Sequence, residues 1–192
     1  MLIRREIFYI EEDDENVTEH VLNLAKKRGN ELGIKDFIVA STTGQTALKA
    51  ARVIDPSEYN LIIVTHATGF KSPGEQEFDE KIRLEIEKKG VKVLTCIHGL
   101  SGVERSLRKQ LGIWGPVELM ANALRLFGEG AKVAIEITIM AADAGLIPMD
   151  KDVIAIAGTG RGADSAYVIK PAHSSNFFDL FVKEIICKPL YH

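Results

Sequence analysis

The 192-residue chain has few cysteines and no large excess of charge of either sign. Its two cysteines, Cys96 and Cys187, lie far apart and match no disulfide framework and no metal-ligand spacing. This pattern is typical of a protein from a reducing compartment. The 24 Lys and Arg residues are balanced by 27 Asp and Glu residues, and the chain has no long basic run. Nucleic acid is therefore not an expected partner, and no metal site is indicated.

The chain also lacks an apolar run long enough to span a membrane. Its most apolar helical segment, 131–144, is interrupted by Glu136 and Asp143 and is shorter than the roughly 20 residues that a spanning helix needs. The N-terminal segment MLIRREIFYIEEDDEN turns acidic too early for a secretory signal peptide. We therefore expect a cytoplasmic protein without a membrane partner. With 46% hydrophobic residues, the chain is expected to fold as one domain over residues 1–192.

Predominantly apolar runs of strand length recur along the chain, at 37–40, 61–65, 91–96 and 151–157. Such runs are typical of strands that are covered on both faces of a parallel sheet. A further strand pattern at 165–170 follows too soon for the crossover that a parallel neighbour requires. It is therefore expected to be antiparallel, as a hairpin at the sheet edge. The predicted fold is a three-layer α/β sandwich with a mostly parallel sheet and an antiparallel edge strand.

Helix patterns lie between these runs. The segment 131–144 is apolar around its circumference and must be covered, which predicts homo-oligomerisation. Glu136 within it would be costly to bury without a partner. A short edge strand is expected at 6–10, a short helix at 177–181 and an extended segment at 184–187. The expected longer helices are 17–33, 46–54, 75–90, 103–112, 116–127 and 131–144.

The turn between the run at 37–40 and the next helix is rich in hydroxyl groups, with the sequence STTGQT at 41–46. The first N–H groups of a helix lack intrahelical acceptors and the helix dipole favours negative charge, so this turn can bind a phosphate. Gly44 would let the backbone approach the anion closely. Alternatively, Thr43 or Gln45 only caps the helix. The GxGxxG and GxxxxGK[ST] fingerprints are absent from the turn.

Because parallel strands end at one edge of a sheet, the loops after the four apolar runs are expected to converge. Ligands of open α/β sheets bind at this edge. The loops are 41–46, 66–74, 98–102 and the glycine-rich 158–164. The predicted ligand-binding residues are Ser41, Thr42, Thr43, Gly44, Gln45, Thr46, His66, Thr68, Gly69, His98, Gly99, Gly158, Thr159, Gly160 and Arg161.

Several of these residues have two possible roles. His66 could donate to a ligand, act as an acid or base, or cap the next turn. Phe70 could stack on a ligand ring or belong to the core. Arg161 could pair with a phosphate or remain an exposed loop residue. Cys96 and His98 are close in sequence, but a nucleophile pair requires a side-chain geometry that spacing does not guarantee.

The order of these motifs resembles the C-terminal regulatory domain of pyruvate kinase. In pyruvate kinases, the turn after the first strand of this domain has the form Ser/Thr-x-Ser-Gly-x-Ser/Thr and holds a phosphate of the sugar bisphosphate effector. The turn at 41–46 matches this form, and the pattern TALKAARVIDP follows it. The likeness covers about 36–169. The chain has no barrel domain and no kinase active-site sequence, so the resemblance implies phosphate binding and not kinase activity.

Over its whole length, the chain is more similar to a small family of stand-alone archaeal proteins with this same fold, including the segments THATGFKSPGEQEF and EITIMAADAGLIP. Members of that family look like binders of flavin mononucleotide (FMN). The resemblance therefore implies FMN as the cofactor, with its phosphate at 41–46. Two functions remain open: a flavin-dependent oxidoreductase, and a non-catalytic regulatory or sensory module that binds a sugar phosphate or nucleotide.

Overall fold

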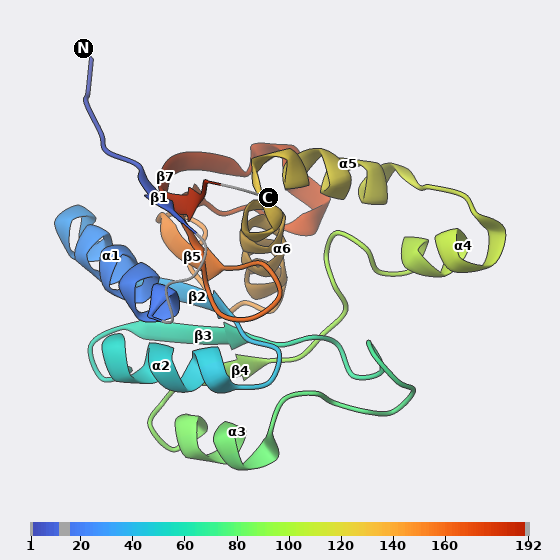
Figure 1. Ribbon diagram of the computed structural model, residues 1–192, viewed down its shortest axis with the longest axis horizontal. Coiled ribbons are helices and arrows are strands. Elements are labelled where there is room, and N and C mark those ends of the chain that lie inside the picture. The colour runs from blue at the N-terminus through green and yellow to red at the C-terminus, as the bar shows by residue number, and fades with distance from the viewer. Residues whose placement is uncertain (1, 12–15, 191–192) are drawn as a thin grey trace.

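The apolar runs pair into one sheet. In the computed structural model, which describes residues 2–11 and 16–190, seven strands pair in the order β1-β7-β6-β5-β2-β3-β4 (Figure 1). Neighbours among β5, β2, β3 and β4 are parallel, which confirms the predicted parallel part of the sheet. The strands are β1 (Phe8–Ile10), β2 (Asp36–Ala40), β3 (Asn60–Val64), β4 (Lys92–Leu94), β5 (Val153–Ala157), β6 (Ser165–Lys170) and β7 (Phe181–Pro189).

Helices cover both faces of this sheet, which confirms the three-layer α/β sandwich. Successive side chains of a strand point to opposite faces. Phe37 and Val39 of β2 thus lie in a core with α1, α2 and α3, while Ile38 lies in a second core with α6. The helices are α1 (Val17–Leu32), α2 (Gln45–Val53), α3 (Glu80–Glu87), α4 (Glu104–Leu111), α5 (Pro116–Leu124) and α6 (Glu129–Asp143), with 3-10 helices η1 (Arg125–Phe127) and η2 (Ser174–Asp179).

The antiparallel strand is β6. It pairs antiparallel with β5, with Ile169 opposite Val153, because the loop between the two strands is too short for a crossover. The sheet continues beyond β6: β7 pairs with it, again antiparallel, and β1 pairs with β7 at the outer edge. The sequence predicts this extension only in part. The short edge strand expected at 6–10 is β1, but for β7, which spans Phe181–Pro189, only an extended segment at 184–187 is expected.

The apolar helix α6 is buried within the chain itself. It packs against β2, β3, β5 and β6, and α5, η1 and η2 also contact it. The carboxylate of Glu136 is 4% exposed, and it pairs with Lys132 and accepts a hydrogen bond from the Leu100 N–H group. The covering of α6 therefore requires no second copy, and homo-oligomerisation stays a prediction. Among the described residues, no helix combines the length and apolar character needed to cross a bilayer.

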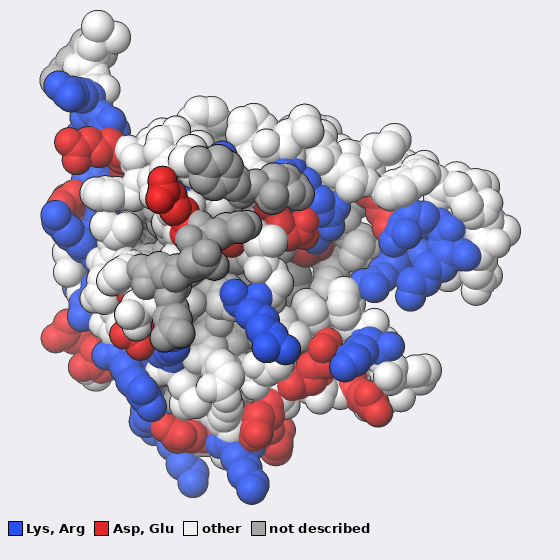
Figure 2. Space-filling view, in the orientation of Figure 1, with Lys and Arg blue, Asp and Glu red and all other residues white. Residues whose placement is uncertain are grey.

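The segment from α4 to α5 projects from the sheet, and α4 has no buried residue (Figure 1). Three basic residues lie on α4: Arg105, Arg108 and Lys109. Figure 2 shows Lys and Arg side chains gathered over this projecting segment, whereas charges of both signs are mixed over the lower part of this face. The N-terminal end of α4 lies near the carboxyl edge of the sheet, where Arg105 contacts Phe70 of the loop after β3.

Candidate functional site

Three of the four predicted loops are joined by side-chain contacts at the carboxyl edge. The hydroxyl oxygen of Thr42, after β2, lies 3.5 Å from His66 Nε2, after β3. The N–H group of Ala67 donates to His98 Nε2, after β4, over 3.1 Å. The parallel pairing of β2, β3 and β4 brings these positions together, as the sequence predicts.

The turn after β2 presents a run of free N–H groups. Ser41 is buried and its hydroxyl accepts the Ala47 N–H group over 3.2 Å, so this side chain caps α2. In the described part of the chain, the N–H groups of residues 42–46 donate to no acceptor. Thr43 and Gln45 are exposed and do not cap the helix, whereas the Thr46 side chain is buried. Five successive donors at a helix N-terminus form a ready anion site.

Gly44 gives this turn its shape. Its φ of 102° lies in the left-handed region, and an added Cβ would come within 2.9 Å of the Ile82 side chain on α3. We therefore predict that Gly44→Ala lowers the free energy of unfolding by about 2 to 4 kcal/mol, through backbone strain and overpacking together. Urea unfolding of the purified variant measures this change.

Gly33→Ala is the matched control for Gly44→Ala. Gly33 also has a positive φ, 69°, but nothing lies within 4 Å of an added Cβ. Gly33→Ala should therefore lower the free energy of unfolding by about 1 kcal/mol, through backbone strain alone. Equal losses in the two variants would show that close packing of α3 on the turn does not contribute.

His66 forms a pair with Glu77. Its Nδ1 lies 2.9 Å from Glu77 Oε2, and an ionised carboxylate can only accept a hydrogen bond. Nδ1 therefore carries a proton, and Nε2 faces the Thr42 hydroxyl. His66 does not cap the following turn; Gln76 instead donates to its backbone carbonyl over 3.0 Å. The side chains of His66 and Glu77 remain 34% and 24% exposed, so ligands can reach the pair.

Phe70 connects the two histidines. Its ring centroid lies 4.1 Å from that of His66 and 5.0 Å from that of His98. The guanidinium of Arg105 lies 4.0 Å from the same ring, a distance suited to a cation–π contact. Thr68 and Gly69, on the same loop, are exposed. Phe70 therefore belongs to the site rather than to either core of the domain.

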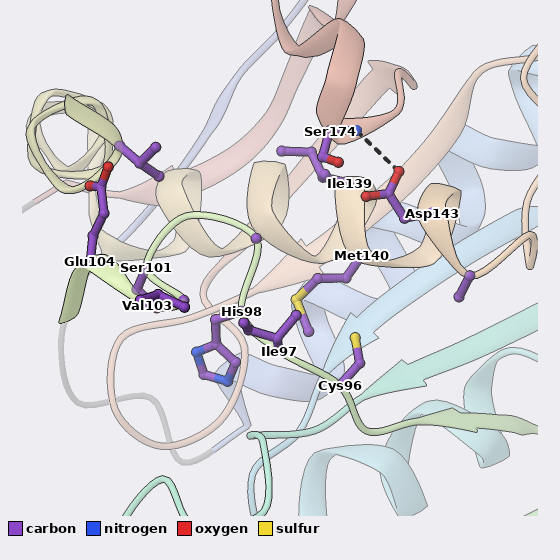
Figure 3. A pocket seen from close by; sticks show the side chains of 14 residues that line it. Cys96, Ile97, His98, Ser101, Val103, Glu104, Ile139, Met140, Asp143 and Ser174 are labelled. Atoms are coloured by element: carbon purple, nitrogen blue, oxygen red, sulfur yellow. Dashed lines mark hydrogen bonds between the residues drawn. The ribbon is translucent and has the colours of Figure 1, made fainter. Parts of the chain in front are cut away.

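His98 also lines a cavity of about 500 Å3 between the loop after β4 and α6. Burial lowers the pKa of His98, consistent with an unprotonated Nε2 that accepts the Ala67 N–H group. Gly99 lines the same cavity, and most of its other walls are apolar. Figure 3 shows Cys96 and Ile97 near Met140 of α6, with His98 on the same loop.

Cys96 does not act as an activated nucleophile in this arrangement. Burial, together with the nearby carboxylate of Asp143, raises the pKa of its thiol, which favours the unreactive protonated form. No hydrogen bond joins Cys96 to His98 among the residues that the structure describes. The alternative of a nucleophile pair is therefore not supported by the geometry.

The glycine-rich loop after β5 opens at the same edge, since β5 is parallel to β2. It is held by Asp164, which accepts the Thr159 N–H group over 2.8 Å, and by Thr18 of α1, which accepts the Ala163 N–H group over 3.0 Å. Gly158 is partly buried, whereas Thr159, Gly160 and Arg161 are exposed. Within the described ranges, no hydrogen bond connects this loop to the other three. Arg161 is thus an exposed loop residue in this structure.

Two residues of the site, Glu77 and Arg105, are not found by the sequence reasoning. The pattern predicts a helix over 75–90, which would place Glu77 on its outer surface, but α3 begins only at Glu80. Asp79 is the overlooked signal, because its carboxylate caps α3 by accepting the N–H groups of Lys81 and Ile82. No local signal marks Arg105, whose position depends on the path of the chain after β4.

Comparison with known proteins identifies the fold family. A family model described as pyruvate kinase, alpha/beta domain, matches residues 19–169, from α1 through most of β6. Among solved structures, the chain is similar to Cryptosporidium parvum pyruvate kinase in complex with ADP, with 15% identity and a TM-score of 0.44. That similarity covers 85% of this chain and 25% of the kinase chain, so this chain spans about a quarter of that protein's length. The chain therefore belongs to the pyruvate kinase alpha/beta domain family.

Proposed function

We propose that the protein binds a phosphorylated ligand, FMN, at the carboxyl edge of the sheet, with the phosphate on the turn at 41–46. The observation that carries this proposal is the run of free N–H groups at residues 42–46, at the N-terminus of α2. Anions are stabilised there by unpaired donors and by the helix dipole. The hydroxyls of Thr42 and Thr43 add donors without adding charge.

The groups beside the turn suit a planar ring. His66, Phe70 and His98 form an aromatic cluster, and His98 leads into the largely apolar cavity of about 500 Å3. Pockets for small ligands have about this volume, with mostly apolar walls and a few polar groups. Nδ1–H of His98 makes no hydrogen bond to a described residue, so it can donate to a carbonyl of the ring. When bound, FMN would supply redox chemistry, as in a flavin-dependent oxidoreductase.

A non-catalytic regulatory or sensory module for a sugar phosphate or nucleotide is the second candidate. This candidate is supported by the turn at 41–46, because its free N–H groups would bind a phosphate whatever molecule carries it. Exposed groups such as Arg161 would then contact the remainder of a flexible ligand. The two candidates share the phosphate turn and differ in whether the aromatic cluster holds a flavin ring.

The visible absorption spectrum of the purified protein separates these candidates, together with mass spectrometry of any ligand released on denaturation. Flavin bands and an FMN mass support the first. Titration with FMN and with riboflavin then isolates the phosphate, because riboflavin carries the same ring without it. A protein that takes up neither, but binds a sugar phosphate, would establish the second candidate.

We predict that Thr43→Val weakens FMN binding about tenfold or more, because a hydrogen bond to a charged group is lost. Valine keeps the shape of threonine, and Thr43 is exposed, so the fold should be retained. Riboflavin affinity should not change. Fluorescence titration with each ligand measures both affinities.

Ser57→Ala is the control for this variant. Ser57 has an exposed hydroxyl in the turn before β3, at the opposite edge of the sheet. Its replacement should leave FMN affinity unaltered. If Thr43→Val binds FMN as tightly as the wild type, the Thr43 hydroxyl is not part of the phosphate site.

A further inference from the structure

His66 has one ring nitrogen held by a carboxylate and the other turned to the phosphate turn. Glu77 Oε2 accepts the Nδ1–H group over 2.9 Å, so whenever the ring is neutral Nε2 presents a lone pair. The Thr42 hydroxyl oxygen lies 3.5 Å from Nε2. Thr42 is also the first residue of the run of free N–H groups. The lone pair therefore lies beside the place proposed for a phosphate.

A phosphate on this turn changes which form of His66 is favoured. A phosphomonoester near neutral pH carries close to two negative charges and offers acceptor oxygens only. The lone pair of neutral Nε2 would repel those oxygens, whereas a protonated ring would donate to them from Nε2 and to Glu77 from Nδ1. Ligand binding thus favours the imidazolium form.

Other charged groups around His66 do not reverse this preference. Glu77, from the loop before α3, favours a positive ring, and it is in direct contact. Arg105 of α4 opposes it, but its guanidinium lies against the Phe70 ring and forms no direct contact with His66 among the described residues. His98, with its ring centroid 5.4 Å from that of His66, is kept neutral by burial. Lys132 and Glu136 of α6, whose charges act on His98, form a buried pair with each other.

We propose that His66 takes up a proton from solvent when a phosphorylated ligand binds, and that Glu77 is the positioning residue that keeps Nε2 turned to the ligand. The inference rests on the proposed function, because it needs a phosphate on the turn at 41–46. The site then binds the phosphate dianion together with a proton. Its affinity for phosphorylated ligands falls as pH rises, and the bound ligand has a proton donor beside it.

Calorimetric titration of the full chain with FMN and with inorganic phosphate tests this coupling. At about pH 7.5, where a phosphomonoester is a dianion, the titration is repeated in buffers of different ionisation enthalpy. The dependence of binding enthalpy on the buffer gives the number of protons taken up. We expect uptake of up to about one proton per site in the wild type.

His66→Gln should bind FMN about tenfold more weakly and take up no proton. His98→Gln is the matched control, because His98 belongs to the same aromatic cluster but has no carboxylate partner; it should retain uptake with inorganic phosphate. Glu77→Leu removes the acceptor and should reduce uptake, whereas Glu77→Gln keeps an acceptor and should retain more of it.

A second readout needs no ligand. Long-range 1H–15N spectra of the histidine rings should show His66 protonated at Nδ1 in the wild type and a mixture of tautomers in Glu77→Leu. Ligand-free His66 protonated at Nε2 would overturn the inference. So would FMN binding without proton uptake, or uptake unchanged in His66→Gln, and either result would leave the proposed function intact. If the wild type binds neither FMN nor phosphate, the proposed function fails and the inference falls with it.

Discussion

Lys132→Met is expected to lower the free energy of unfolding by about 3 to 5 kcal/mol, because it leaves a buried carboxylate without its countercharge. The side chains of Lys132 and Glu136 are 7% and 6% exposed and lie one helical turn apart on α6. Glu136 would keep only the hydrogen bond from the Leu100 N–H group. Urea unfolding, followed by circular dichroism, measures the loss.

Lys89→Met provides the control. Lys89, just after α3, and Glu85, within it, form an ion pair with the same i,i+4 spacing, but their side chains are 49% and 54% exposed. Solvent screens such a pair, so the unfolding midpoint should hardly move. If Lys132→Met is as stable as Lys89→Met, the pair on α6 is hydrated in solution and does not hold the loop at Leu100.

Phe37→Ala should be comparably destabilising, by about 3 to 5 kcal/mol. Phe37 is fully buried on β2, with an edge-on contact to Tyr59 at a centroid distance of 5.3 Å. Its removal leaves a cavity beneath the strand that leads into the phosphate turn. The free energy of unfolding reports the loss, and FMN affinity of the folded fraction should change less than in Thr43→Val.

Phe178→Ala is the matched variant on the surface, since this side chain is 87% exposed. Its stability should remain close to that of the wild type. A loss in Phe178→Ala as large as that in Phe37→Ala would mean that η2 is packed in solution in a way that this structure does not show.

The parallel part of the sheet is predictable because its strands are buried on both faces. Predominantly apolar runs at 37–40, 61–65 and 151–157 identify β2, β3 and β5 closely. The part of the sheet beyond β6 is harder to predict, because charged residues interrupt the apolar residues of β7. The surroundings of α6 are not predictable either. Apolar residues on all sides of the helix show that it must be buried, but not whether this chain or a second copy buries it.

At the site, the order of strands along the sequence predicts which loops lie together, but not which side-chain atoms contact one another. Parallel strands bring Thr42, His66 and His98 to one edge whatever their side chains are. The partners of His66 depend on the loop between β3 and α3, which has no regular structure to predict. Ser41 shows the same limit, since its hydroxyl faces Ala47 and not the ligand side of the turn.

The outer edge of the sheet joins distant parts of the described chain. Phe8 of β1 lies opposite Cys187 of β7. During synthesis, β1 leaves the ribosome early and has no strand to pair with until β7 emerges. The loops after β2, β3 and β4 are made well before that, and domains generally fold as units during synthesis. In a nascent chain, β1 therefore has no sheet partner until β7 has been made, and the complete domain, with the ligand site at its carboxyl edge, folds as a unit after that point.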